Sequence, residues 1–470
     1  MKNAILLFVL FWANAVAETQ TSRPNVLLIG IDDLNDWTGF LAGHPQARTP
    51  HMDALADRGR VFTNAHCAVP VCSASRVSVM SGMAAVSHGS YELGPAYEEL
   101  SALKAIPTLH RYFKDHGYRT FTGGKVLHHG FRGRLSKDID RILFNRRGGP
   151  RPKGRMGRPR HWSPAWDWGA FPETDAEMFD WQLAQKAAEA LKESHDKPFF
   201  MSVGFFRPHV PLFVPPKWFE LYPLETLNLA KVLTGDVDDL PPNFLSINQY
   251  AVAPTHEDVL RHERQRGLTQ AYLASISFVD ECVGIVMDAL ASSPYRDSTI
   301  IVLWSDHGFH LGEKHHWAKR TLWEESTRVP LLFAGPGIVP GDQCRESVSL
   351  IDIYPTLVEV CGLPEANHVD GQSLMPQLLN GQAPREQPAI ISSYFGNHAV
   401  RTRDWRYIRY SDGAEELYNH QSDGDERDNR VHDPSLVNIR NAHRDWLPRM
   451  ARAEVKAVSE RDRFKSAENR

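Results

Sequence analysis

The sequence of 470 residues contains no apolar run long enough to cross a membrane. A spanning helix needs about 20 consecutive apolar residues, whereas the clearest apolar run, from Ala4 to Ala13, is far shorter. A lysine precedes this run and small residues follow at Ala15 and Ala17, a pattern typical of a signal peptide. We therefore predict cleavage after Ala17 (signal peptide 1–17), no membrane span, and a secreted or periplasmic protein.

The chain also lacks an excess of charge of either sign. It has 53 lysines and arginines against 57 acidic residues, a net charge of −4. Nucleic-acid-binding proteins usually carry a marked basic excess, so we expect no nucleic acid partner. The length and 42% hydrophobic residues indicate a globular protein with a large core.

Cysteine is scarce, and its count is odd. The five cysteines are Cys67, Cys72, Cys282, Cys344 and Cys361. In an oxidising compartment an odd count leaves at least one thiol unpaired or chemically altered. For all but Cys72 we favour a buried apolar residue or half of a disulfide, with Cys344 and Cys361 as one possible pair.

Hydrophobic runs predict an α/β fold with a mostly parallel sheet flanked by helices. Between the strands, one helix is indicated by a stripe of apolar residues with 4,3 spacing from Tyr272 to Leu290, and a short one by Thr49–Gly59, with Thr49 as its cap and Gly59 as its end. The predicted buried strands are Asn25–Asp33, Tyr118–Gly124, Pro198–Phe206, Ser298–Gly308 and Val329–Gly337.

Acidic residues follow two of these strands. Asp32 and Asp33 end the first, and Asp306 with His307 ends another. In parallel sheets ligands gather at the carboxyl ends of strands, so both pairs should meet at one edge. Converging carboxylates repel one another, which makes a cation the natural occupant. Either pair alone could equally cap a helix. Oxygen ligands favour Ca²⁺, while the histidine leaves magnesium, manganese or zinc open.

Cys72 precedes a segment of helical character, Ser73–Met80. It would therefore lie at a helix N-terminus, where free N–H groups and the helix dipole favour negative charge. Such a position suits a nucleophile, and a thiol enzyme of the Cys-His protease or amidase type is a rival interpretation. A thiol acyl-transfer enzyme has no need of the adjacent cation site.

Five motifs in order resemble the formylglycine-dependent sulfatases of the alkaline phosphatase superfamily, most of all the iduronate-2-sulfatase branch. CSASR followed by VSVMSG fits the family signature CxAxR. The others are PNVLLIGIDDL, GGKVLHHG, FFRPHVPL and SDHGFHLGEKHHWAKRTLWEESTRVPLLF. Together they cover nearly the whole mature chain. The resemblance implies an enzyme, a sulfuric ester hydrolase.

The resemblance also implies that a maturation enzyme oxidises Cys72 to formylglycine, also called 3-oxoalanine, which adds water to become a geminal diol. One diol oxygen attacks the sulfur of a sulfate ester and the alcohol leaves. The second hydroxyl then loses its proton, sulfate is expelled and the aldehyde returns. This route is a form of nucleophilic catalysis.

The family's site residues carry over to matching positions of this chain. Arg76 matches the arginine that holds the hydrate, His128 the histidine that helps to deprotonate it, and His209 the histidine that contacts sulfate and protonates the leaving oxygen. Lys125 and Lys319 match the sulfate-binding lysines. The metal positions are matched by Asp32, Asp33, Asp306 and His307, with modified Cys72 completing the shell.

The segment Arg132–Arg160 carries eleven lysines and arginines against two aspartates. We predict a long basic loop, which either guides a polyanion such as a sulfated polysaccharide (a glycosaminoglycan, for example) or is simply a solvated charged loop.

Past residue 385 the pattern changes to short antiparallel strands and a helix from about Ser435. We therefore expect a catalytic domain at 22–385 and a smaller C-terminal subdomain at 386–470. The alternatives are a phosphate or phosphonate ester hydrolase of the same superfamily and a noncatalytic protein that binds sulfated glycans.

Overall fold

The fold is described from a computed structural model, in which residues 23–242 and 252–456 can be described. The predicted signal peptide, residues 1–17, lies outside the described residues, and so does the end of the predicted C-terminal subdomain, residues 457–470. Among the described residues, no helix combines the length and the apolar composition that crossing a membrane requires.

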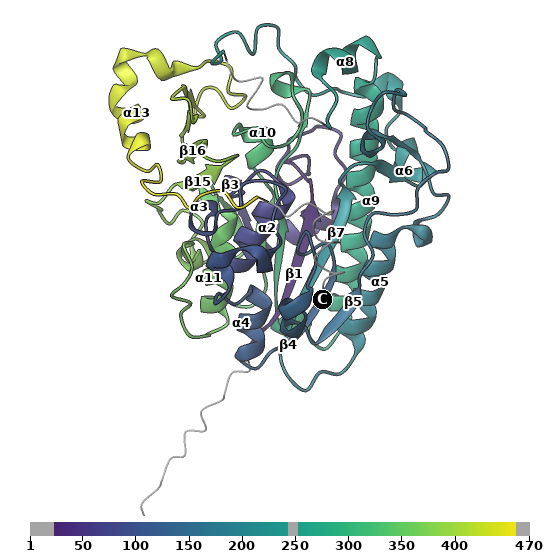
Figure 1. The fold of residues 1–470 in the computed structure, drawn as a ribbon. Coiled ribbons are helices and arrows are strands. Elements are labelled where there is room, and N and C mark those ends of the chain that lie inside the picture. The colour runs from purple at the N-terminus through teal and green to yellow at the C-terminus, as the bar shows by residue number, and fades with distance from the viewer. Residues whose placement is uncertain (1–22, 243–251, 457–470) are drawn as a thin grey trace, which may run out of the picture.

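One eight-stranded sheet forms the centre of the molecule (Figure 1), with the strand order β13-β2-β12-β9-β1-β7-β4-β5. Its strands are β1 (Asn25–Asp32), β2 (Gly59–Phe62), β4 (Arg119–Gly124), β5 (Arg141–Phe144), β7 (Phe199–Pro208), β9 (Thr299–Ser305), β12 (Leu331–Ala334) and β13 (Gly341–Cys344). Strand β12 pairs antiparallel with both β9 and β2, while the other pairs are parallel. The five predicted strands and the mostly parallel α/β fold are confirmed.

Helices cover both faces of the sheet, and the side chains of β1 alternate between them. Leu27, Ile29 and Ile31 belong to one core cluster, whereas Val26 and Leu28 belong to the other. A strand buried on both faces reads as a continuous hydrophobic run, which is why β1 was visible in the sequence. The first cluster includes α1 (Pro50–Ala56), α5 (Phe179–Lys192) and α9 (Gln265–Ala291), and the second α2 (Cys72–Ser81), α4 (Leu109–Asp115) and α11 (Ile353–Val360).

The 27-residue helix α9 is buried more completely than the sequence predicts. The stripe from Tyr272 to Leu290 is buried, but so are Leu273, Phe278 and Cys282 outside it. The reason is that α9 contacts α1, α5, β7, β8 (Leu212–Val214) and α6 (Pro216–Glu220), so several of its sides are covered. A single-stripe prediction is therefore too narrow for this helix.

Two local predictions are wrong. The Thr49 side chain does not cap α1, because its hydroxyl accepts from Gly39 N at 2.8 Å and donates to Asp53 Oδ1 at 3.0 Å. Gly59 does not end that helix, which stops at Ala56, but starts β2.

All five cysteines are buried free thiols, so the possible Cys344–Cys361 disulfide is not formed. Cys344 lies in edge strand β13, and Cys361 follows α11.

The basic segment Arg132–Arg160 is not one long loop. It contains a 3-10 helix at Gly133–Asp138 and then β5, which pairs parallel with β4 as the edge strand of the main sheet. Only the part after β5 is irregular. Three of the four residues of β5, RILF, are apolar, but the run is short and lies among many charged residues, so it did not stand out in the sequence.

Four antiparallel strands form a separate C-terminal sheet, as predicted. They are β15 (Ala389–Ser392), β16 (His398–Arg401), β17 (Trp405–Arg409) and β18 (Glu415–Asn419), and α13 (Val437–Arg444) follows. Shorter elements complete the described fold: the strand pairs β3 (Ala65–His66) with β14 (Val348–Ser349), β6 (Trp168–Ala170) with β8, and β10 (His310–Leu311) with β11 (Trp317–Ala318), and the helices α3 (Ala85–His88), α8 (His256–Arg261), α10 (Glu324–Thr327) and α12 (Met375–Leu379).

Candidate active site

Four side chains converge where β1 and β9 end. Asp32 is the last residue of β1 and Asp33 the next, while Asp306 and His307 follow β9. The parallel register pairs Ile31 with Ser305, so both ends reach the same edge. The backbone N–H of Asp33 donates to Asp306 Oδ1 at 3.1 Å, and all four side chains are fully buried. The structure thus brings the two predicted pairs together.

This group has the donor atoms that a divalent cation needs. Asp33 Oδ2 is buried and has no hydrogen-bond partner among the described residues. Candidate ligand atoms of Asp32, Asp33, Cys72 and His209 lie within 4.8 Å of one another, and so do those of Cys72, Asp306 and His307. An unsatisfied buried carboxylate oxygen costs free energy unless a positive group takes it up. The residues present therefore fit a hard cation.

The carboxylates are held by Arg76, one helical turn after Cys72. Arg76 Nε donates to Asp306 Oδ2 at 2.8 Å and Nη2 donates to Asp32 Oδ1 at 3.1 Å, while Nη1 donates to the carbonyl of Lys125. Burial raises the pKa of Asp306 to about 7, although Arg76 opposes the shift. Burial likewise disfavours charge on His307, but Asp306, Cys72 and Asp33 together outweigh it and raise the pKa of that imidazole to about 9.

Cys72 is the first residue of α2 and lies among positive charges. The preceding residue provides no side-chain cap, so the free N–H groups of the helix end remain available. Cys72 Sγ lies 3.0 Å from Lys319 Nζ and 3.1 Å from His307 Nε2. Burial alone would raise the pKa of the thiol, but Lys125, Lys319 and His307 hold it well below its usual range. Position 72 is therefore suited to negative charge.

Lys125 and His128 follow β4. The N–H of Lys125 donates to Gly204 O at 2.7 Å, and its ammonium group pairs with Asp32. His128 hydrogen-bonds Cys72, and its Nδ1 is buried without a partner among the described residues. Burial lowers the pKa of His128 to about 4, so this imidazole is neutral at pH 7. The adjacent histidine of the same motif turns away, toward Gly94 O.

His209 lies where the site meets solvent. Its side chain is 21% exposed, and Nε2 lies 3.9 Å from Asp33 Oδ2. Nδ1 lies 2.5 Å from Val210 O, which can only accept, so Nδ1 carries a hydrogen and Nε2 faces the site. All ten residues predicted from the sequence thus lie around one centre.

Other groups at this centre were missed. Tyr272 was counted as part of an apolar stripe, yet its hydroxyl donates to Asp33 O at 2.6 Å and accepts from Asn35 N at 3.0 Å. Ser75 Oγ donates to Asp306 O at 2.5 Å. Arg147, from the basic segment, donates to the carbonyl of His128. Of these groups, only Ser75 could have been found from the sequence, because it lies within the CSASR motif.

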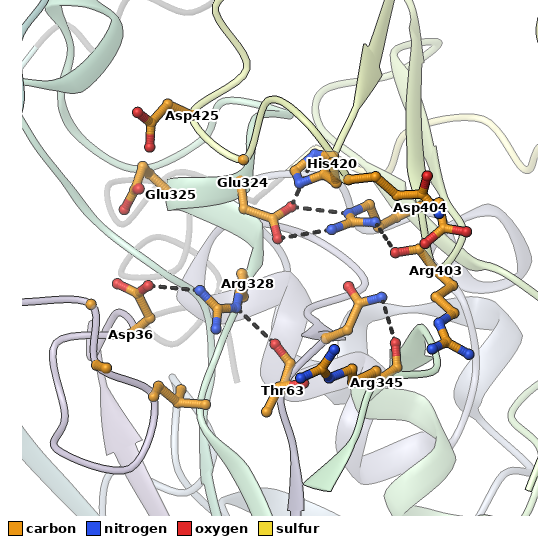
Figure 2. A pocket seen from close by; sticks show the side chains of 17 residues that line it. Asp36, Thr63, Glu324, Glu325, Arg328, Arg345, Arg403, Asp404, His420 and Asp425 are labelled. Carbon is orange, nitrogen blue, oxygen red and sulfur yellow. Dashed lines mark hydrogen bonds and ion pairs between the residues drawn. The ribbon is translucent and has the colours of Figure 1, made fainter. Parts of the chain in front are cut away.

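A second, separate cavity of about 850 Å³ lies between the loop after β1, α10 and the C-terminal sheet (Figure 2). None of the ten predicted residues lines it. Figure 2 shows Asp36 paired with Arg328, whose Nη1 donates at 2.7 Å, and Glu324 close to His420. Arg401 also donates to Glu324, with its Nε at 3.1 Å. Opposite charges pair within this cavity rather than concentrating one sign.

Helix α10 connects this ion-pair cluster to the active-site loops. The carbonyl of Ser326 accepts from Gly308 N at 2.9 Å, directly after His307. The carbonyl of Thr327 accepts from Cys67 N at 2.9 Å, in the segment that leads to α2. Ion pairs from the C-terminal sheet to α10 therefore support both loops indirectly.

Comparisons with known proteins agree with this geometry. The family model "Sulfatase" matches residues 24–363, and "N-sulphoglucosamine sulphohydrolase, C-terminal" matches residues 312–453. A sulfatase of Formosa agariphila is 39% identical over 87% of this chain and 83% of its own. A choline-sulfatase of Rhizobium meliloti is 31% identical over 88% and 83%, and the iduronate 2-sulfatase of Homo sapiens 30% over 74% and 70%.

Solved structures share the fold. A phosphonate monoester hydrolase of Agrobacterium radiobacter superposes with a TM-score of 0.75 at 22% identity, covering 90% of this chain and 95% of that one. A structure solved in complex with its substrate D-glucosamine-2-N,6-O-disulfate gives 0.69 at 19% identity, covering 91% and 97%. The family matches and the sequence relatives together show that this chain belongs to the sulfatase family of the alkaline phosphatase superfamily and is a sulfuric ester hydrolase.

Proposed function

We propose that this chain is an exported sulfatase that hydrolyses sulfate esters of a sulfated sugar or polysaccharide, with formylglycine formed from Cys72. The observation that carries the proposal is the position of Cys72 Sγ, at the N-terminus of α2, 3.0 Å from Lys319 Nζ and beside a buried carboxylate group. Sequence similarity to iduronate 2-sulfatase supports the choice of a sugar substrate.

The residues around position 72 are suited to binding a sulfate group. The hydrated aldehyde supplies the hydroxyl that attacks sulfur. The ammonium groups of Lys125 and Lys319 neutralise sulfate oxygens, helped by the free N–H groups of α2. Arg76 is fixed by Asp32 and Asp306, so its guanidinium orients position 72 without rearranging during the reaction.

In the proposed reaction, His128 accepts a proton and His209 donates one. His128 is neutral at pH 7, contacts position 72, and takes up the proton that must leave for sulfate to be expelled. His209 directs Nε2 into the site and protonates the leaving sugar oxygen. A leaving alkoxide is strongly basic, so this protonation matters most for sugar alcohols.

A divalent cation, which we propose to be Ca²⁺, would be held by Asp32, Asp33, Asp306, His307 and the side chain at position 72. It would supply positive charge that lowers the cost of ionising a hydroxyl and neutralises sulfate oxygens. The assignment is supported by Asp33 Oδ2, which is buried and has no hydrogen-bond partner among the described residues.

The proposal includes the route to the mature enzyme. A signal peptide at 1–17 takes the chain to the periplasm or outside the cell, and a formylglycine-generating enzyme modifies Cys72. The catalytic domain occupies 22–385 and the C-terminal subdomain 386–470.

Mass spectrometry of the tryptic peptide from Val61 to Arg76, from a host that matures sulfatases, tests the proposal. We expect an aldehyde at Cys72, and loss of aryl sulfate turnover in Cys72→Ala with its unfolding midpoint retained. An unmodified thiol despite a working maturation enzyme, or full activity of Cys72→Ala, contradicts it. Faster turnover of aryl phosphonates than of aryl sulfates would favour the phosphonate alternative, to which the fold of the phosphonate hydrolases gives some support.

A further inference from the structure

Another cavity of about 850 Å³, different from the one in Figure 2, has a positively charged lining and lies away from the active site. We call it the arginine cavity. It is lined by three arginines of the basic segment and two at the start of α9, with Glu263 as the one acidic residue among those that line it. The five arginines are Arg155, Arg158, Arg160, Arg264 and Arg266. None of the ten active-site residues lines it.

The positive charge of this cavity is compensated only in part. Arg158 Nε lies 3.8 Å from Asp167 Oδ2, but other arginines differ. Among the described residues, no carboxylate forms an ion pair with Arg155, Arg160 or Arg264, and all three are exposed. Arg266 is fixed by carbonyl groups, since its Nη1 donates to Leu224 O at 2.7 Å and to Leu227 O at 2.9 Å. Carbonyl acceptors position a guanidinium but leave its charge in place.

The cavity wall is ordered by a single carboxylate. Asp167 Oδ1 accepts from Gly157 N at 2.8 Å, Arg158 N at 3.0 Å and Trp168 N at 3.0 Å. Arg158 itself donates from Nη1 to Trp162 O at 2.6 Å. The backbone that carries the arginines of the basic segment is therefore held in place before any ligand binds.

The start of α9 adds to the positive potential. The cap residue Arg264 makes no side-chain cap, and the first turn has no acidic residue. At 27 residues α9 is about 40 Å long, and its C-terminus leads within a few residues to the start of β9. Its N-terminus therefore lies toward the edge of the sheet where β1 and β9 end (Figure 1), which is the edge of the active site.

We propose that the arginine cavity is a noncatalytic binding site for sulfate groups of a polysaccharide, which holds a substrate chain while another of its sulfates occupies the active site. This inference rests on the proposed function. The planar guanidinium group of arginine can donate two parallel hydrogen bonds, which match the oxygens of a sulfate group. Location at the active-site edge favours a polymeric substrate over nucleic acid as the occupant.

The test measures binding of dextran sulfate to protein carrying Cys72→Ala, so that turnover plays no part. The cavity variant is Arg155→Ala/Arg160→Ala/Arg264→Ala. Its matched control, Arg58→Ala/Lys104→Ala/Lys192→Ala, removes the same charge from exposed positions outside the cavity. We expect the Kd to rise about tenfold in the cavity variant and less than about twofold in the control.

Equal Kd values for the parent and the cavity variant, or equal weakening by the control, overturn the proposal. So does binding of duplex DNA as tight as that of dextran sulfate at the same salt concentration. Both triple variants are checked for the unfolding midpoint of the parent, and Arg160→Ala or Arg264→Ala alone should each raise the Kd about twofold. Because binding is measured without catalysis, its outcome does not depend on turnover. A matured wild-type enzyme that hydrolyses no sulfate ester would refute the proposed function without deciding this binding test.

Discussion

Glu324 on α10 forms an ion pair with Arg406 on β17, across 82 residues of sequence. Burial would raise the pKa of Glu324, but Arg401, His420 and Arg406 hold it well below its usual range. Arg406 also donates to Thr327 Oγ1 at 3.0 Å, at the end of α10. The C-terminal sheet is thereby tied to the helix whose carbonyls hold the active-site loops.

Replacing Glu324 with glutamine should therefore destabilise the protein. The change leaves Arg401 and Arg406 buried with an incomplete partner, which costs about 3 kcal/mol. Urea unfolding measures the loss, and turnover of 4-nitrophenyl sulfate should fall as well. Glu193→Gln, which breaks an exposed pair with Arg141, is the control and should cost less than about 1 kcal/mol. Similar losses in both variants would show that the Glu324 cluster has no special role.

Gly204→Ala should impair both stability and turnover. A Cβ at Gly204 would lie 2.3 Å from the carbonyl carbon and oxygen of Lys125, so β4 and β7 must move apart. Overpacking of this kind costs about 1–3 kcal/mol and shifts Lys125, whose N–H bonds Gly204 O. Gly154→Ala, where nothing lies within 4 Å, is the matched control. Wild-type kcat/KM in Gly204→Ala would contradict the need for this close approach.

The role proposed for His209 predicts a dependence on the leaving group. His209→Ala should lower kcat for a sugar sulfate about a hundredfold, because the alkoxide needs a proton. For 4-nitrophenyl sulfate the loss should be much smaller, since nitrophenolate leaves without one. His161→Ala, at an exposed histidine paired with Asp258, should affect neither substrate. Equal losses for both substrates would mean that His209 binds sulfate but does not protonate.

Removal of the proposed cation should abolish activity. Without the cation, Asp33 Oδ2 has no hydrogen-bond partner among the described residues, so dialysis against EDTA should lower turnover about a hundredfold or more, with a lower unfolding temperature. Adding back Ca²⁺, Mg²⁺, Mn²⁺ or Zn²⁺ in turn identifies the ion. Full activity after metal analysis has shown less than a tenth of an equivalent would refute the metal site.

Asp180 should make stability depend on pH. Its carboxylate accepts from Phe206 N and Arg207 N at 2.9 Å each, and burial raises its pKa to about 6 despite the charge of Arg207. The folded state therefore binds a proton more tightly than the unfolded state, and this contribution to stability is full below about pH 4 and is lost as pH rises through 6.

Asp180→Asn removes that titration. The stability of the variant relative to wild type should rise by about 2 kcal/mol between pH 4 and pH 7, as followed by urea unfolding. A difference that stays constant over this range would show that the pKa of Asp180 is not raised.

Much of the fold and of the centre was visible in the sequence. β1 is buried on both faces, so its hydrophobic run stood out, and the acidic pair after it had to lie at a carboxyl edge. Cys72 was placed at the start of α2 because the following segment reads as a helix. The strand β5 and the absence of a Thr49 cap were not visible, since local patterns report neither edge pairing nor competing hydrogen bonds.

By itself, the sequence determined five of the eight strands of the main sheet and, from strand ends and a helix start, Asp32, Asp33, Asp306, His307 and Cys72, because burial and strand-end position leave local patterns. The other five residues of the centre followed from the resemblance of the sequence motifs to the sulfatase family. Only the tertiary structure decided that Tyr272 reaches Asp33, that Glu324 pairs with Arg406, and that two segments far apart in the chain build one arginine cavity. Such contacts join residues tens to hundreds of positions apart, and no periodicity in a short window specifies which distant charge or hydroxyl a side chain will meet.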